Sequence, residues 1–589
     1  MTRVASWLGP THGYLSLTRR WVRGSSGGMV ALSLLVGAGA GLGAVAFRWL
    51  IGSATKIFTG TSDYSAVGRV PNHWVHWLGI GFVVLAPVVG GLVYGPLVDR
   101  FAREARGHGV PEVMYAVSQR GGRIPARVAG VKALASAICI GSGGSVGREG
   151  PIVQIGSALG SWLGQLAKVP ESRLRTLVAC GAAGGIAATF NAPIAGVFFA
   201  LELLLGNFAA DAFGAVVLSA VTASVIGRAA FGNTPFLHLP AFSMGSGWDY
   251  AWFALLGLIA GGVGVAFTHI LYAVEDLCDW AWRGPEWARP ALGGLLLGLL
   301  LLALPQMYGV GYPVLENGVA GRYALGFLLV LLVGKMLATS LTIGIGGSGG
   351  VFAPSLFIGA MLGSAFGLLV HQLNPATSGP LGAYALVGMG AVFAGAARAP
   401  ITAVIIMFEL TGEYTIILPL MLAIVLATGI SRALMRDTVY TAKLRRRGVD
   451  LNPPTGLRAS SSTPVSAVMG LAPEAVPHDL PLAIAAQRLL SSGASVLPVR
   501  RGDTIVGIVT ARAVSEALTD DDANTLTVDQ ITEQPATVTT MHSVVEASRV
   551  LAEADATGLP VVDDLGELTG WLTYNDLLRA MNETELARL

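Results

Sequence analysis

The chain has 589 residues, of which 53% are hydrophobic and 13% are charged, and its formal net charge is +2. A soluble domain carries about 25% charged residues, so most of this chain is not an ordinary soluble protein. The small net charge gives no reason to expect a nucleic-acid partner. Half of the acidic residues, 18 of 36, lie after residue 450. This asymmetry predicts a membrane domain followed by a soluble domain.

Basic residues indicate how the chain is oriented. We expect residues 1–25 to form a polar N-terminal tail without the cleavage site of a signal peptide. Basic residues cluster at the end of this tail and again at 100–106, 120–127 and 443–447. The positive-inside rule then predicts a multi-pass protein of the cell membrane with both termini in the cytoplasm.

A membrane domain over residues 26–440 is predicted from a series of apolar stretches. They lie at 28–53, 74–97, 127–140, 149–166, 175–208, 212–231, 250–277, 288–304, 323–345, 352–372, 381–409 and 414–435. Several are shorter than the ~20 residues that a full crossing needs, and many are interrupted by Gly or Pro. Short, interrupted segments predict half-helices that meet inside the membrane.

Two halves of this domain, about 26–231 and 250–440, repeat the same motifs in the same order. The run Lys132–Pro151 recurs 203 residues later as Lys335–Pro354, with its Gly-Gly-Ser, Gly and Pro positions kept. Two homologous halves with a site at their interface are the architecture of many transporters. We therefore expect a functional site where the two repeated segments meet.

The repeated loops have the composition of an anion site. Helix N-termini attract anions through free N–H groups and a partial positive charge, which hold an ion without trapping it. The glycine-rich loops Gly143–Gly147 and Gly346–Gly350 can expose such N–H groups. Pro151 and Pro354 suit the first turn of a following helix, where a missing N–H costs little. Two half-helices, one from each repeat, would then point their positive ends at one place.

Glu149 lies inside the first of these donor-rich segments. A carboxylate within a membrane segment is a functional hypothesis by default. When it is ionised, it is itself an anion and competes with a transported anion for the same donors; when it is protonated, it can leave them. Glu149 can therefore act as a gate and carry a proton. The alternative is an ordinary acidic residue that stabilises the start of a helix.

Three motifs and one tyrosine resemble those of the chloride channel and transporter (CLC) family. Gly147-Arg-Glu-Gly-Pro151 is similar to the family's gating-glutamate motif. Gly107-His-Gly-Val-Pro111 and Gly350-Val-Phe-Ala-Pro354 are similar to its first and second anion-site motifs, and Tyr440 falls where the family has an anion-coordinating tyrosine. The resemblance covers residues 26–445, with the motifs in the family's order.

The resemblance implies a fold, a site and an assembly. The fold is an all-α polytopic membrane domain of two inverted repeats with broken, re-entrant helices. The anion would be coordinated by N–H groups near Arg148 and Gly150, by those of Val351 and Phe352, and by the Tyr440 hydroxyl. The family also implies a homodimer with one pathway in each subunit, embedded in a lipid bilayer.

His108 departs from the family pattern, because a serine hydroxyl contacts the central anion in the family's usual form of this motif. A neutral imidazole donates one hydrogen bond, and a protonated one adds a charge. We expect His108 either to alter anion preference and pH sensitivity or to turn aside and leave only backbone donors at the ion.

The position after Glu202 departs as well. Many family exchangers have an inner proton-transfer glutamate where this chain has Leu203. Leucine carries no proton, although water or another acid, with Glu202 as one candidate, can relay protons. Glu202 and Glu409 each lie nine residues after a proline of an equivalent Asn/Arg-Ala-Pro motif, so both can instead be structural. Lys132, equivalent to Lys335, either adds positive potential to the pathway or pairs with carboxylates.

The soluble tail contains a second, smaller repeat after a linker at 441–463. It resembles a pair of CBS domains, at 464–522 and 523–589, with α/β units of helix, strand, turn, strand and helix. CBS pairs often bind adenine nucleotides through a Thr or Ser followed three residues later by Asp. The second unit has this pattern in Thr573 and Asp576 and the first lacks the acid. The pair would bind a nucleotide at one site at most, or would serve only dimerisation.

These patterns predict chloride transport through a pathway gated by Glu149, coupled to protons. The alternative is a passive chloride channel gated by voltage or pH. A remote alternative is an intramembrane serine hydrolase, because Gly143-Gly-Ser145-Val-Gly147 fits G-x-S-x-G, with His108 or His269 as base. The sequence indicates no enzyme, no metal cluster and no required cofactor, and a cation transporter would need several inward-facing carboxylates.

Overall fold

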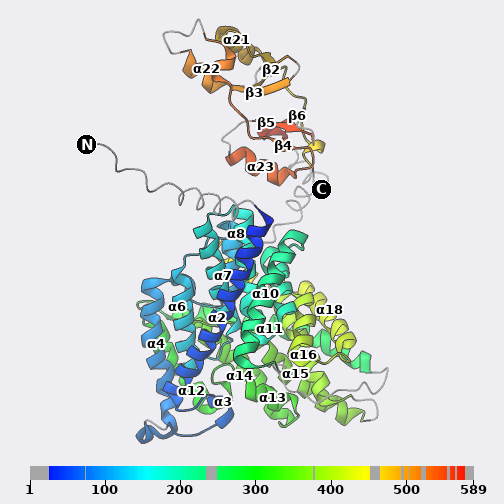
Figure 1. Ribbon diagram of the computed structural model, residues 1–589. Coiled ribbons are helices and arrows are strands. Elements are labelled where there is room, and N and C mark those ends of the chain that lie inside the picture. The colour runs from blue at the N-terminus through cyan, green and yellow to red at the C-terminus, as the bar shows by residue number, and fades with distance from the viewer. Residues whose placement is uncertain are drawn as a thin grey trace, which may run out of the picture. The chain divides into compact units, whose positions relative to one another are not determined.

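A computed structural model gives the architecture (Figure 1). It describes residues 25–72, 75–233, 249–375, 379–450, 464–492, 496–502, 504–518, 526–553, 558–563 and 567–577. Nearly all of the predicted N-terminal tail and most of the linker lie outside these residues. The chain divides into two compact units, Met1–Val449 and Asp450–Leu589, as the charge asymmetry of the sequence predicts.

The first half of the membrane unit is built from helices. They are α2 (Ser26–Thr59), α3 (Tyr64–Val67), η1 (His76–Gly81), α4 (Phe82–Phe101), η2 (Arg103–Ala105), α5 (Val110–Gln119), α6 (Arg127–Gly141), α7 (Glu149–Ala167), α8 (Glu171–Phe190), α9 (Pro193–Phe199), η3 (Ala200–Leu205) and α10 (Ala210–Phe231).

The second half follows the same plan. Its helices are α11 (Asp249–Ala281), α12 (Arg289–Ala303), η4 (Pro305–Met307), α13 (Tyr312–Val319), α14 (Leu325–Gly344), α15 (Phe352–Leu373), α16 (Leu381–Ala397), α17 (Pro400–Thr411), α18 (Ile417–Leu434) and α19 (Thr441–Arg446). Within the described residues, seven of the membrane unit's helices are long and apolar enough to cross a membrane. Several of the other apolar helices, among them α12, α16 and α17, are too short for a full crossing, as the interrupted stretches predict.

Two long apolar stretches break at equivalent places. The chain reverses at Asn191 and again at Arg398, which both adopt left-handed backbone angles, and a new helix then starts at Pro193 and at Pro400. Proline suits the first position of a helix because its missing N–H has no partner there in any case. The predicted stretches 175–208 and 381–409 are therefore each two helices joined by a tight turn.

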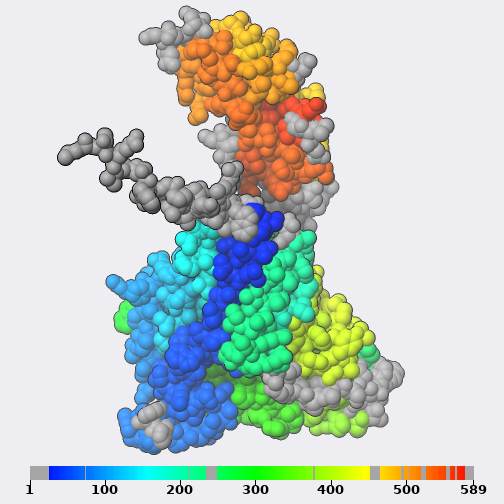
Figure 2. Space-filling model, viewed as in Figure 1, coloured from blue at the N-terminus to red at the C-terminus, as the bar shows by residue number. Residues whose placement is uncertain are grey.

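The outer face of this unit is apolar. In Figure 2, α2 (blue) and α10 (green) run side by side on the face turned to the viewer. Side chains of α2 that point away from the protein include Leu35, Leu42 and Trp49, all more than half exposed. Such a surface suits lipid rather than water.

Glycines allow the central helices of each repeat to touch backbone to backbone. A Cβ added at Gly156 of α7 would lie 2.1 Å from the carbonyl oxygen of Gly181 on α8. The equivalent pair in the second repeat, Gly359 of α15 and Gly388 of α16, is equally tight, with the corresponding distance 2.3 Å. Small residues at helix crossings let membrane helices gain packing energy that lipid cannot supply.

The C-terminal unit contains two similar three-stranded sheets. In one, β1 (Val476–Pro477) pairs in parallel with β2 (Val496–Arg501), which pairs antiparallel with β3 (Thr504–Thr510). In the other, β4 (Val538–Thr539), β5 (Gly558–Val562) and β6 (Leu568–Thr573) repeat this order. The associated helices are η5 (Val465–Ala467), α21 (Leu482–Ser492), α22 (Ala511–Ala517), η6 (Val528–Ile531) and α23 (Val544–Glu553).

The two small units exchange their leading segments. Val465, near the start of the first unit, is buried in the core of the second. Val528, near the start of the second, is buried in the core of the first. The two CBS-like units therefore form one interlocked body and not two independent beads.

Gly156→Ala is expected to destabilise the membrane unit, because the added methyl group meets the Gly181 carbonyl and α7 must move away from α8. Overpacking of this kind costs ~1–3 kcal/mol. The measurement is thermal unfolding in detergent. Gly130→Ala in α6 is the matched control, since a Cβ there meets nothing within 4 Å. Equal stability of both variants would contradict the tight crossing.

Candidate anion pathway

The two glycine-rich loops pair with each other at the centre of the membrane unit. The Gly147 N–H donates to the Gly350 carbonyl at 2.7 Å, and the Gly350 N–H donates back to the Gly147 carbonyl at 2.6 Å. These are repeat-equivalent residues, and their bridge is antiparallel. Antiparallel pairing of equivalent residues relates the two loops by a local two-fold axis, as inverted repeats require.

A third segment joins this pair. The Gly107 N–H donates to the Gly347 carbonyl at 3.0 Å, in a parallel bridge between Gly107 and Ser348. A Cβ added at Gly150 would lie 2.0 Å from the His108 carbonyl oxygen, so only glycine permits this approach. The three motifs that the sequence singles out therefore meet at one place.

Two buried lysines brace the loops. The Lys132 ammonium donates to the carbonyls of Ala105 and Gly107 at 2.9 and 2.8 Å. Lys335 donates to the Ser145 hydroxyl at 2.9 Å and to two carbonyls of the segment before α13. The sequence offered two roles for Lys132, an added positive potential or pairing with a carboxylate. The structure shows a different contact, because its ammonium group donates to backbone carbonyls.

Glu149 is the first residue of α7, and its side chain crosses to the other repeat. One carboxylate oxygen accepts a hydrogen bond from the Ala353 N–H, in the first turn of α15, at 3.3 Å. The other accepts from the Tyr312 hydroxyl at 2.6 Å. A Cβ at Gly147 would lie 2.0 Å from the carboxylate, so this glycine makes room for it. The buried acid thus occupies the donor-rich start of a helix.

Donors remain beside it. Within the described part of the chain, the N–H groups of Val351 and Phe352 donate no hydrogen bond to protein, as expected at the start of an α-helix. The Phe352 ring lies 4.5 Å from Phe393 and 5.9 Å from Phe190, measured between centroids. An anion here would meet amide donors in a site walled by aromatic rings.

Tyr440 is the residue immediately before α19. Its side chain is 1% exposed and lies near enough to Glu149 to interact with it electrostatically. The preceding residue, Val439, is fixed by its N–H to the Ala396 carbonyl and by its carbonyl to the Tyr272 hydroxyl. These two hydrogen bonds fix the backbone beside the buried Tyr440.

His108 faces a cavity of about 280 Å³. Its ring is 3% exposed, and neither ring nitrogen has a hydrogen-bond partner among the described residues. Ion pairs line the cavity, including Lys443 with Glu275 and Arg447 with Glu112. The remaining charged lining residues are Arg103, Arg106, Asp279, Glu286 and Arg289. The ring nitrogens are therefore left to a ligand or water in the cavity, and the ring does not turn aside to a protein partner among the described residues.

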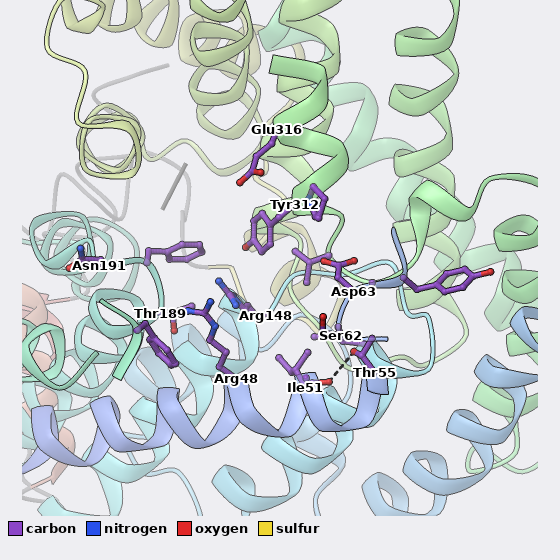
Figure 3. A pocket seen from close by; sticks show the side chains of 18 of the residues that line it. Arg48, Ile51, Thr55, Ser62, Asp63, Arg148, Thr189, Asn191, Tyr312 and Glu316 are labelled. Carbon is purple, nitrogen blue, oxygen red and sulfur yellow. Dashed lines mark hydrogen bonds between the residues drawn. The ribbon is translucent and has the colours of Figure 1, made fainter. Parts of the chain in front are cut away.

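A second cavity, of about 520 Å³, is lined by Arg148, which precedes Glu149, and by Tyr312, which contacts it (Figure 3). Arg148 and Tyr312 point toward one another across it, with the guanidinium carbon 5.1 Å from the ring centroid. Arg48 reaches in from α2 and lies over the Phe231 ring. The cavity lies at the end of α2 where the chain turns into α3, and the His108 cavity lies beside α19. The two cavities thus lie beside different motifs of the candidate site, one next to Arg148 and Tyr312 and the other next to His108.

Comparison with known proteins identifies the chain. The family model for the voltage-gated chloride channel matches residues 90–432, more than half of the chain, and CBS domain models match 465–520 and 528–583. This chain belongs to the voltage-gated chloride channel (CLC) family. The resemblance and the fold class inferred from the motifs are confirmed.

Several CLC proteins are similar over most of this chain. A ClcB-like chloride channel protein of Ralstonia nicotianae is 34% identical over 437 residues, covering 72% of this chain and 98% of that relative. The H⁺/Cl⁻ exchange transporter ClcA of Vibrio cholerae is 36% identical over 359 residues, covering 59% and 76%.

Solved structures agree. A slow cyanobacterial Cl⁻/H⁺ antiporter has a TM-score of 0.62 and 26% identity, covering 71% of this chain and 97% of that one. A eukaryotic CLC transporter has a TM-score of 0.62, covers 96% and 98%, and at 21% identity supports the fold alone.

In this CLC chain, the carboxylates of Glu202 and Glu409 each cap the start of a helix in the other repeat. The Glu202 carboxylate, in η3, accepts the N–H groups of Ile401 and Thr402 at the start of α17, at 3.2 and 2.8 Å. The Glu409 carboxylate, in α17, accepts those of Ile194 and Ala195 at the start of α9, at 3.0 and 2.7 Å. This reciprocity favours the structural hypothesis for both.

The geometry gives the hydrolase alternative no support. The Ser145 hydroxyl accepts from Lys335, whose three ammonium protons each have an acceptor, so Lys335 is no free base. Neither His108 nor His269 contacts Ser145 among the hydrogen bonds of the described residues.

In the CBS pair, the Asp576 carboxylate accepts hydrogen bonds from the Thr573 hydroxyl at 2.6 Å and from the Thr573 N–H at 2.9 Å. These bonds cap the helical turn that follows Thr573.

Glu202→Gln is expected to lower thermal stability while leaving proton coupling intact. The amide offers one acceptor oxygen in place of two, so one cap of α17 is lost, and caps are worth ~0.5–2 kcal/mol. Unfolding temperature in detergent and the ratio of protons to chloride moved by liposomes measure the two effects. Loss of coupling with unchanged stability would instead make Glu202 a proton relay.

Proposed function

We propose that this protein exchanges chloride for protons across the membrane, with Glu149 as the gate. The observation that carries the proposal is the hydrogen bond from the Ala353 N–H to the Glu149 carboxylate. A side-chain anion from one repeat occupies the start of a helix from the other, where a chloride ion would find the same donors.

The gate follows from competition for these donors. Ionised, the Glu149 carboxylate is held by the start of α15 and excludes chloride. Protonated, it loses its charge and most of its attraction to the helix N-terminus, so chloride takes its place next to Val351 and Phe352. Occupancy of the site by chloride is thereby linked to protonation of Glu149.

Proton coupling rests on the relatives. The proteins from Vibrio cholerae and from the cyanobacterium are named as H⁺/Cl⁻ exchangers, which favours exchange over the passive channel. Leu203 cannot relay a proton, so we propose that inner protons travel through water in the cavity beside His108, where Glu112 and Glu275 lie. The channel remains the alternative if that route does not conduct.

Assembly and orientation complete the proposal. We propose a homodimer with one pathway in each subunit and both termini in the cytoplasm, supported by the basic cluster at 443–447. The interlocked CBS pair contributes to the dimer. If it also binds an adenine nucleotide, Asp576 must exchange its bonds with Thr573 for the ribose hydroxyls.

Glu149→Gln is expected to abolish proton movement and leave chloride flux that no longer depends on pH. The reason is that the amide neither takes up nor releases a proton and has no charge. The measurement is paired chloride and pH recording from liposomes under a chloride gradient. Wild type should take up protons against their gradient as chloride leaves. Chloride efflux from wild type without protons would establish the channel alternative, and no efflux from a folded preparation would contradict chloride as substrate.

His108→Ser is expected to change the preference between chloride and nitrate about 5-fold, the effect of roughly one hydrogen bond of ~1 kcal/mol. The serine hydroxyl is shorter than the imidazole and donates from a different position. Relative liposome efflux rates of the two anions measure the change. If both selectivity and pH dependence stayed at wild-type values, the His108 ring would have no role at the ion.

A further inference from the structure

Tyr312 makes the shortest side-chain contact to the gating carboxylate. Its hydroxyl donates to Glu149 at 2.6 Å, within the range of hydrogen bonds from a hydroxyl to an ionised oxygen, about 2.5–2.7 Å. Tyr312 begins α13 in the second repeat, whereas Glu149 begins α7 in the first. The bond therefore joins the two repeats at the gate itself.

Tyr312 lies between Glu149 and the 520 Å³ cavity, which is the outer one in the proposed orientation because it adjoins the end of α2. Its ring lines the 520 Å³ cavity and lies under the Arg148 guanidinium, while its hydroxyl points to the buried Glu149 (Figure 3 shows the ring and Arg148). The backbone before it is tightly turned, with φ of +86° at Gly311, and Pro313 follows. The side chain thus stands on a fixed support.

The equivalent residue in the first repeat has no such group. Tyr312 precedes the proline of Gly309-Val-Gly-Tyr-Pro313 and corresponds to Val110 of Gly107-His-Gly-Val-Pro111. A valine cannot donate a hydrogen bond. The contact therefore breaks the symmetry of the repeats on the side where Glu149 meets the outer cavity.

We propose that Tyr312 is a positioning residue that latches ionised Glu149 in the anion site and thereby sets the pH at which the pathway opens. This rests on the proposed function, in which protonation releases the gate. An O–H donor favours the ionised carboxylate over the neutral acid, because the charge-assisted bond is the stronger one. The latch holds the gate closed until the outer solution is more acidic.

Other charged or titratable groups around Glu149 also act on it. They come from its own element and from each element packed against it: Arg148 beside it, Lys335 of α14, Tyr440 before α19 and, through the adjoining segment, His108. Of these, none has a hydrogen bond to the carboxylate among those of the described residues. Tyr312 is thus the group whose removal changes one bond to the gate and leaves the surrounding charges in place.

Tyr312→Phe tests the latch, because it removes the hydroxyl and keeps the ring. Loss of a hydrogen bond to a charged group should move the pH of half-maximal chloride flux from liposomes about one to two units upward. Flux then persists in more alkaline solution. Glu149→Asp, which draws the carboxylate back from Tyr312, should move it in the same direction.

Tyr308→Phe is the matched control. Tyr308 is buried, lines the same cavity and donates to the Gly141 carbonyl at 2.8 Å, and it makes no hydrogen bond to Glu149 among those of the described residues. It should leave the pH profile in place. An equal shift in Tyr308→Phe, or no shift in Tyr312→Phe and Glu149→Asp, would overturn the latch.

The Glu149→Gln background separates the two proposals. There the flux should be independent of pH, and adding Tyr312→Phe should change nothing further. If Glu149→Gln keeps the wild-type pH profile, the gate itself is wrong. If Glu149→Gln flattens the profile while Tyr312→Phe leaves it unmoved, the gate stands and only the latch fails.

Discussion

The pair of hydrogen bonds between Gly147 and Gly350 holds the two glycine-rich loops against each other, and the arrangement of the candidate site depends on it. It joins equivalent residues of the two repeats, so equivalent backbone segments lie on opposite sides of it, although their side chains differ. The starts of α7 and α15 converge because the paired loops run directly into them. Only glycine allows this, since a Cβ at Gly350 would lie 2.6 Å from the Gly150 nitrogen. The anion site is thus a product of symmetry and close backbone approach.

The buried lysines clarify how such a site remains weak enough to release an ion. The ammonium groups of Lys132 and Lys335 donate hydrogen bonds to backbone carbonyls and to one hydroxyl. They satisfy acceptors that would otherwise face the membrane interior unpaired. In the proposed site, amide N–H groups with partial charges would be left to face the ion, which matches the requirement that binding be favourable but reversible.

Sequence patterns predicted the fold and marked Glu149 as the candidate gate, but they missed Tyr312, which contacts it. Repeated motifs predict which segments meet, because equivalent loops flank the axis, and an acid in an apolar segment marks Glu149. Tyr312 carries no such mark: its partner is 163 residues away, and only the three-dimensional approach of the repeats reveals the bond. The one available signal was a hydroxyl-bearing ring where the first repeat has Val110. Glu202 was ambiguous for the same reason, since its partners lie in the other repeat.

The exchange of caps between Glu202 and Glu409 has a consequence for how the chain is made. The first repeat is synthesised and inserted before Glu409 exists, so the N–H groups at the start of α9 have no protein acceptor until the second repeat arrives. The same holds for the Gly147 N–H, which needs Gly350. Until then, the N–H groups at these positions of the first half can be satisfied only by lipid headgroups, water or another protein. Assembly of the two halves, rather than insertion of either, is the step at which this protein becomes folded.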